Sequence, residues 1–140
     1  MSLAHTAVTF RYERLRAVTT GIMEAAGTTF LLLIAVRHFN AGPTAKALIA
    51  AGGSVGHVIS PLVVNQAAKL GWPVAQAASR VGLLGAASLM LAVFAPGLPL
   101  YVLGCVLATL CASAAIPLMT QVYQMNYPPE ERGKIGRAHV

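Results

Sequence analysis

The few side chains in this 140-residue chain that could do chemistry include ionisable groups inside long apolar runs. Glu24 is the only charged residue between positions 17 and 36, and Thr28 follows it one helical turn later. Because lipid favours the neutral form of a carboxyl, Glu24 can bind and release a proton, or it can face a cationic substrate. The alternative is a structural carboxyl that is hydrogen-bonded to a neighbouring helix or to water. Thr28 shares the face of Glu24 and is expected to line any cavity that Glu24 lines.

His57 and Arg80 are the other candidates for a substrate or proton pathway. His57 lies in the middle of the second apolar run, on the face that Gly53 defines four residues earlier. It can relay protons with Glu24, or it can be a neutral histidine that packs between helices. Arg80 lies about two turns into the third apolar run, where it can face Glu24 or further parts of a longer protein. The alternatives for Arg80 are a structural ion pair and a side chain that extends to the membrane interface.

No residue pattern predicts enzymatic catalysis, a cofactor or a metal ion. Ser54 and His57 are three residues apart on one expected helix, which is a poor placement for activating a nucleophile. The glycine-rich stretch 52–56 lacks the Lys-Ser/Thr pair that would hold phosphate and metal. Cys105 and Cys111 lie in one apolar run, where free cysteine behaves as a small hydrophobe.

Four apolar runs must position these residues. The chain is 56% hydrophobic and 10% charged, with a mean hydropathy of +0.68, whereas soluble domains carry about 25% charged residues. A helix of about 20 apolar residues crosses a bilayer. The sequence therefore predicts an all-α membrane protein with transmembrane helices at 17–36, 44–67, 74–94 and 100–123. The expected organisation is an N-terminal tail, a four-helix transmembrane region, a loop and a short tail, at residues 1–16, 17–123, 124–134 and 135–140.

Small residues and prolines predict local features of these spans. Gly52 and Gly56 form a small-xxx-small pair that permits close helix contact in lipid. Gly82 and Ala86 are expected to form a second small face, on the third span. Pro61 is expected to kink or locally unwind the second span. The uncharged stretch 95–99 predicts a tight turn, and Trp72 in the preceding connection is placed as an interfacial anchor.

Positive residues predict the orientation of the chain in the membrane. With a cytoplasmic N-terminus, the inside carries seven Lys and Arg residues and the outside two, with Arg80 uncounted. The inside set is Arg11, Arg14, Arg16, Lys69, Arg132, Lys134 and Arg137, and the outside set is Arg37 and Lys46. Most of these charges lie at the ends of apolar runs and not in a patch with aromatic residues, so no nucleic acid partner is expected. The chain is predicted to lie in the cell membrane and to cross it several times. Its expected partner is the lipid bilayer.

The exit from the fourth span carries a resemblance. In major facilitator superfamily transporters the loop after the fourth span often reads Pro-x-x-x-Arg-Gly, and Pro128, Arg132 and Gly133 match this spacing. Together with the basic tail and the small-residue-rich second span, this loop resembles the N-terminal part of such a transporter over about residues 11–134.

The loop between the second and third spans departs from the family's Gly-x-x-x-Asp-Arg-x-Gly-Arg-Arg. Pro61, Asn65 and Gln66 stand at the glycine, aspartate and first arginine, and the later basic pair is missing. This departure indicates a divergent branch.

The resemblance implies a fold and a function. The family has twelve spans in two six-helix halves, with the substrate near the midplane between the halves. This chain would supply four helices of the N-terminal half of a secondary active, proton-coupled carrier of a small solute. It would be truncated and inactive without the missing C-terminal helices, and it does not specify the substrate.

Two other functions stay open. Residues 24–29 resemble the first-span Glu-x-x-Gly-Thr-Thr of small multidrug resistance transporters, which implies a complete four-helix antiporter of protons and cationic drugs. The later spans do not follow that family, and the charge bias disfavours its dual-topology members. A non-transporting four-span membrane scaffold is the third possibility.

The last residues do not continue toward a fifth span. Lys134 and residues 135–140 can be encoded by AAGATCGGAAGAGCACACGTC, which contains the sequence of a common short-read sequencing adapter. We therefore expect residues 135–140 to be a non-native tail on a fragment, the alternative being a native tail.

Overall fold

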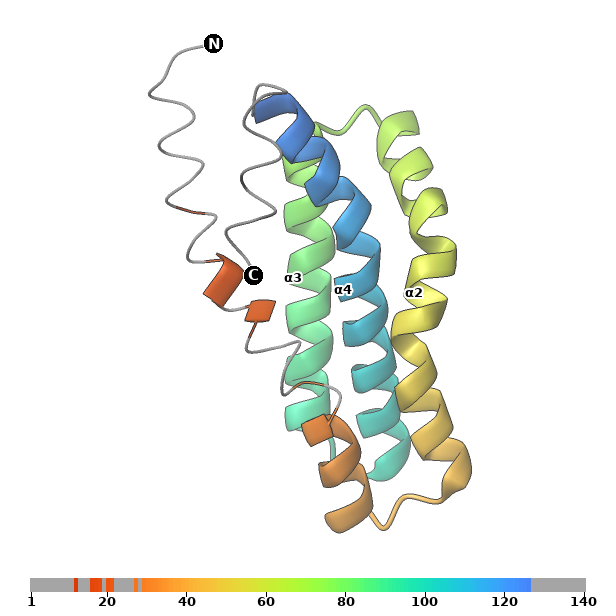
Figure 1. Cartoon of the computed structure of the whole chain (residues 1–140). Helices are drawn as coiled ribbons and strands as arrows, with labels where there is room; N and C mark the ends of the chain where they lie inside the picture. Colours follow the sequence, from red (N-terminus) through yellow and green to blue (C-terminus); the bar gives the residue numbers. More distant parts are fainter. Residues whose placement is uncertain (1–11, 13–15, 19, 22–26, 28, 127–140) are drawn as a thin grey trace.

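The structure of the chain, a computed structural model, describes residues 29–126 and the separate positions 12, 16–18, 20, 21 and 27. A helical segment at 29–37 leads into three long helices, α2 (Pro43–Lys69), α3 (Val74–Val93) and α4 (Leu98–Asn126). They run up, down and up beside one another, with α4 between α3 and α2 (Figure 1). All three are long and apolar enough to cross a membrane. The described residues are therefore all-helical, as expected of an all-α membrane protein.

The helix ends agree with the second, third and fourth predicted spans to within three residues. Of the first predicted span, only 29–37 is described as a continuous helix. Two predicted connections are corrected. Leu98 and Pro99 lie in the first turn of α4, where proline fits because the N–H groups there have no partner within the helix. At its other end α4 continues to Asn126, beyond the expected start of the loop at 124.

Small residues allow α4 to pack closely against both neighbours, whereas α2 and α3 barely contact each other. A Cβ atom added to Gly56 of α2 would lie 2.7 Å from the carbonyl oxygen of Leu110 and 2.9 Å from its Cα. On the other side of α4, a Cβ on Gly104 would lie 2.7 Å from the carbonyl oxygen of Ser88. A Cβ atom on Gly52 would meet the side-chain hydroxyl of Thr109 and would lie 3.2 Å from the carbonyl oxygen of Val106. The predicted close-contact surface at Gly52 and Gly56 is confirmed.

The predicted small face at Gly82 and Ala86 of α3 meets no other helix within the described residues. Both residues are exposed, and nothing in the structure lies within 4 Å of a Cβ placed on Gly82. The face of α3 that meets α4 instead carries Gly85, Ser88 and Ala92, which are three and four residues apart. The choice between these two faces depends on where α4 lies, which the small residues alone do not specify.

A buried cluster joins the helices at the end where α2 begins, called here the Pro43 end. Tyr101 of α4 is only 3% exposed, and its hydroxyl donates a hydrogen bond of 2.9 Å to the carbonyl of Leu31. Its ring centroid lies 4.8 Å from that of Phe39. These contacts attach the helical segment 29–37 to the first turns of α4.

Helix α2 is continuous through Pro61, so the predicted local unwinding does not occur. Proline has no N–H to donate to the carbonyl four residues earlier, which here belongs to His57. The hydroxyl of Ser60 donates a hydrogen bond of 2.8 Å to that carbonyl. A side chain therefore replaces the backbone hydrogen bond that Pro61 removes.

Candidate functional site

Several predicted functional residues lie outside the part of the chain that the structure describes. They are the proton-pathway candidates Glu24 and Thr28 and the loop residues Pro128, Arg132 and Gly133. The tail at 135–140 also lies outside it. The other two candidates, His57 and Arg80, are described, and they occupy different helices.

His57 lies on an exposed part of α2. Its Nδ1 is 2.8 Å from the carbonyl oxygen of Gly53, so the predicted shared face is confirmed. Because a carbonyl only accepts hydrogen bonds, Nδ1 carries the proton of this bond. That bond leaves Nε2 as the ring nitrogen available to a second partner. The ring is not packed between the described helices, which differs from the structural role considered for it.

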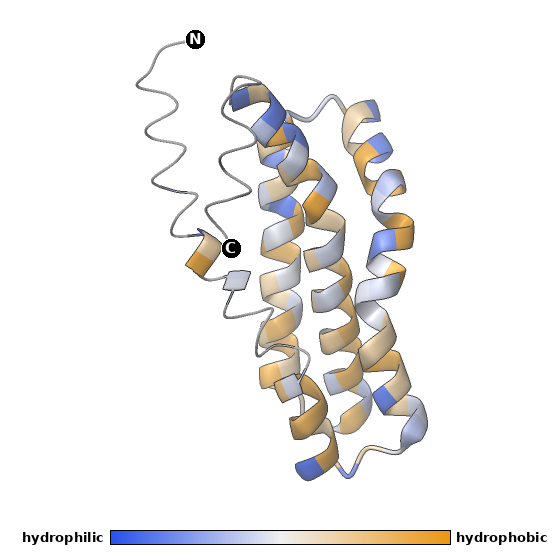
Figure 2. Cartoon of the chain, in the orientation of Figure 1, coloured by the Kyte–Doolittle hydropathy of each residue, from blue (hydrophilic) through white to orange (hydrophobic). Residues whose placement is uncertain are grey.

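His57 belongs to a longer stripe, named here the polar α2 face. At 3.6 residues per turn, this stripe lies about half a turn around the helix from Gly52 and Gly56, and hence opposite α4. It consists of small and polar residues, all exposed: Ala47, Ala50, Ser54, His57, Pro61, Asn65 and Ala68. Figure 2 shows hydrophilic positions recurring along α2, whereas the lower half of α3 is mostly hydrophobic.

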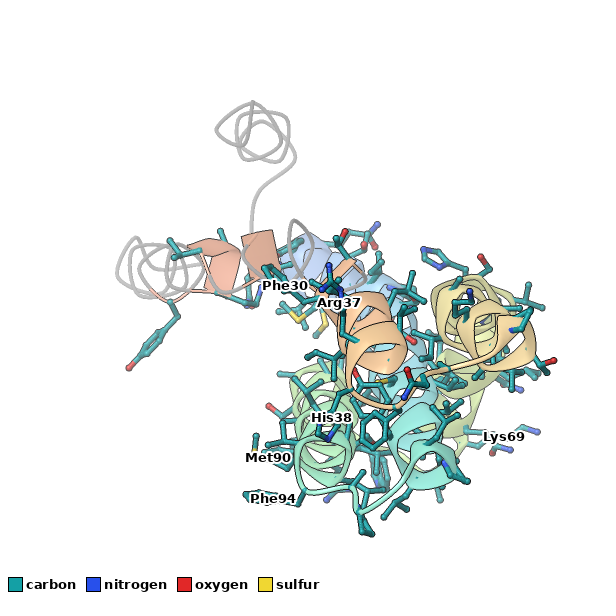
Figure 3. All side chains as sticks on the ribbon, turned by 90° about the horizontal axis from the view of Figure 1, so that it is seen from below. Phe30, Arg37, His38, Lys69, Met90 and Phe94 are labelled. Atoms are coloured by element: carbon teal, nitrogen blue, oxygen red, sulfur yellow. The ribbon has the colours of Figure 1, made fainter. Side chains whose placement is uncertain are left out.

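Beside this stripe, α2 carries a second exposed face of a different kind. This lipid face of α2 consists of Leu48, Val55, Val58 and Leu62. Large apolar side chains also project from the outer side of α3, where Met90 and Phe94 point away from the other helices (Figure 3). Such faces suit hydrocarbon, whereas polar side chains in lipid require water or a protein partner. The polar side chains of the polar α2 face are therefore less suited to hydrocarbon than the lipid face of α2.

Arg80 contacts an aromatic ring at the end of the molecule where α2 ends, called here the Lys69 end. Gly71, with a φ of 64°, ends α2 in a Schellman motif in which the N–H groups of Gly71 and Trp72 donate to the carbonyls of Ala68 and Ala67. This turn places the Trp72 ring under the guanidinium of Arg80, with 4.0 Å between Cζ and the ring centroid. The contact is a cation–π interaction.

No carboxylate neutralises Arg80 within the described residues. The four acidic residues of the chain are at positions 13, 24, 130 and 131, and none is described. His57 and Arg80 are not brought together, because α2 and α3 barely contact each other. The sequence indicated the interfacial position of Trp72 but not its contact with Arg80, which forms across the turn between the helices.

A groove lies between α2 and α3 near the Lys69 end. It has a volume of about 400 Å³, and its lining is almost entirely apolar. Leu62, Gln66 and Leu70 line it from α2, Ala77 and Val81 from α3, and Trp72 from the turn between them. No signal in the sequence pointed to this groove, because it depends on how far apart the two helices lie.

Comparison with protein-family models, with curated proteins and with solved structures finds no match for this chain. Among the described residues, no group of three or more His, Cys, Asp or Glu side chains could hold a metal ion. The described part of the chain is all-α and has three helices that are long and apolar enough to cross a membrane.

Proposed function

We propose that this chain is the first part of a secondary active carrier that moves a small solute across the cell membrane, and that it forms four helices of the N-terminal half of a major facilitator-type fold. The observation that carries the proposal is the polar α2 face. It is exposed along the length of α2 and lies opposite the only described helix against which α2 packs closely.

The physical reason is the cost of polar groups in hydrocarbon. With lipid alone around α2, the side chains of Ser54, His57 and Asn65 would lie in a medium that offers them no hydrogen bonds. A water-filled pathway between two helix bundles removes this cost, and carriers of this type place their substrate in such a pathway. The neighbouring lipid face of α2 has no polar side chain, so α2 would separate the bilayer from the pathway.

In this proposal Glu24 exchanges the coupled proton, and His57 relays that proton together with Glu24. The Nδ1 of His57 is engaged by Gly53, which fixes the ring and leaves Nε2 to accept or donate a proton. Arg80 has a different role, because its guanidinium contacts Trp72 at the Lys69 end.

Cysteine labelling in intact membranes tests the aqueous pathway. Ser54→Cys and Asn65→Cys place a thiol on the polar α2 face. Val55→Cys and Leu62→Cys are the controls on the lipid face. We expect a membrane-impermeant thiosulfonate to react with the first pair and not with the second, because thiols react as thiolates, which need water. The native Cys105 and Cys111 are buried and should add little background.

Equal protection of both pairs would show that the polar α2 face is not exposed to water, as expected of a scaffold, and would contradict the proposal. Sequencing the locus beyond codon 134 tests the carrier independently, since the proposal requires further spans in the intact gene. In the intact protein, Glu24→Gln should abolish proton-coupled uptake, and unchanged coupling would remove Glu24 from the mechanism.

A further inference from the structure

We infer that the groove between α2 and α3 binds an anionic phospholipid, with an acyl chain in the groove and the phosphate held by Lys69 and Arg80. This site is separate from the proposed solute pathway, because it lies on the other side of α2 from His57. The first step is the chemistry of the groove. Its volume of about 400 Å³ falls in the range of ligand pockets, about 300–1,000 Å³, but it offers almost no polar groups.

Two cations lie next to residues that line the groove. Lys69 follows Gln66 by one turn and Leu62 by two turns on the same side of α2, and both of these residues line the groove. Its side chain extends outward from the end of the helix (Figure 3). On the other side, Arg80 lies over Trp72, which also lines the groove. An apolar groove lined in part by a tryptophan, with two cations beside its lining residues, matches the two parts of a phospholipid.

Charge decides in favour of an anionic headgroup. Positions 25–129 contain no Asp or Glu, so neither cation has a carboxylate partner in this part of the chain. A phosphate offers oxygen atoms that accept hydrogen bonds from both guanidinium and ammonium groups. An anionic headgroup such as that of phosphatidylglycerol carries no positive charge, so the attraction between its phosphate and the two cations is not weakened. In a zwitterionic lipid the positively charged choline repels the same two cations. Basic pockets between transmembrane helices bind anionic headgroups for the same reason.

Trp72 is the only tryptophan of the chain and therefore reports on the groove directly. The full chain is placed in bilayers of equal parts phosphatidylglycerol and phosphatidylcholine, with bromine on the acyl chains of one lipid at a time. Bromine quenches tryptophan fluorescence on contact. We expect brominated phosphatidylglycerol to quench Trp72 more strongly than brominated phosphatidylcholine.

Substitutions then identify the headgroup contacts. Lys69→Gln should lower the preference for phosphatidylglycerol about fivefold, the contribution of one cation near a membrane surface. It leaves the contact between Trp72 and Arg80 intact, so a loss of preference cannot be attributed to a displaced reporter. Arg80→Gln should lower the preference by a similar factor. Lys46→Gln removes a charge from the far end of the same helix and should leave the preference unchanged.

Three outcomes would overturn the inference. Equal quenching by the two lipids would mean that the groove binds any acyl chain and does not select for the headgroup. Absence of quenching by both would mean that another helix or a second copy of the chain covers the groove. A loss of preference in Lys46→Gln as large as in Lys69→Gln would mean that only the overall charge of the protein attracts the lipid.

Discussion

At the scale of single residues, Ser60 explains how α2 contains a proline without a break. Pro61 leaves the carbonyl of His57 without its backbone donor, and in hydrocarbon an unpaired carbonyl costs several kcal/mol. The hydroxyl of Ser60 donates to that carbonyl at 2.8 Å. Ser60 thus supports the part of the helix that presents His57, and this effect needs no contact with any other helix.

Ser60→Ala should therefore destabilise the protein by about 1 kcal/mol, the contribution of one hydrogen bond in a membrane helix. The measurement is thermal unfolding in detergent, followed by circular dichroism. Thr120→Ala is the matched control. The hydroxyl of Thr120 donates to the carbonyl of Ile116, four residues earlier in its own helix. Unlike the carbonyl of His57, the carbonyl of Ile116 also has a backbone donor, which is the N–H of Thr120. Equal destabilisation by the two substitutions would contradict the role given to Ser60.

At the scale of helices, α4 packs on two sides while α2 and α3 each pack on one. In its most apolar stretch, 39% of the residues are buried, against 17% in those of α2 and α3. The contacts of α4 with α2 involve Val106, Leu110 and Ser113, and those with α3 involve Gly104 and Cys111. At 3.6 residues per turn these two sets lie on opposite sides of the helix. Small residues at both contacts keep the three helices close together.

Gly56→Ala should separate α2 from α4 and destabilise the protein by about 1–3 kcal/mol, as overpacking does. The added Cβ would lie under 3 Å from backbone atoms of Leu110, which cannot move aside as a side chain can. Gly53→Ala is the control on the same helix, because its Cβ would meet only Ser113 Oγ, at 3.5 Å. Thermal unfolding in detergent compares the two. A Gly56→Ala protein as stable as Gly53→Ala would show that the helices are not held this closely.

At the scale of the whole molecule, charge is distributed unequally between the two ends. Lys69 and Arg80 lie toward the Lys69 end, where the guanidinium of Arg16 also hydrogen-bonds the hydroxyl of Tyr123 in the last turns of α4. Arg37 and Lys46 lie toward the opposite end, so the described residues place three cations toward the Lys69 end and two toward the Pro43 end. Cytoplasmic ends of membrane helices carry the excess of Lys and Arg. We therefore keep the orientation predicted from the sequence, with a cytoplasmic Lys69 end and a cytoplasmic N-terminus, as a proposal to be tested.

Cysteines introduced at the two ends of α2 test this orientation. Both Thr44 and Leu70 are exposed, so each can carry a reactive thiol. In intact cells, we expect a membrane-impermeant maleimide to label Thr44→Cys and not Leu70→Cys. After the membrane is permeabilised, both should react, which controls for accessibility. Labelling of Leu70→Cys in intact cells would reverse the orientation.

The sequence by itself determined the three long helices and their ends to within three residues, because the length and polarity needed to cross a bilayer are properties of consecutive residues. It also identified Gly52 and Gly56 as a contact surface. It did not identify which side of α3 meets α4, because that depends on the position of α4.

Only the tertiary structure decided which faces of the helices are covered. The cation–π contact of Arg80 with Trp72, the groove beside it and the exposure of His57 all depend on distances between helices. In a bilayer an apolar side chain is about as stable against lipid as against another helix, so hydrophobicity does not specify how the spans pack. Close packing of small residues and a few polar contacts make that choice, and they act only once the helices are side by side.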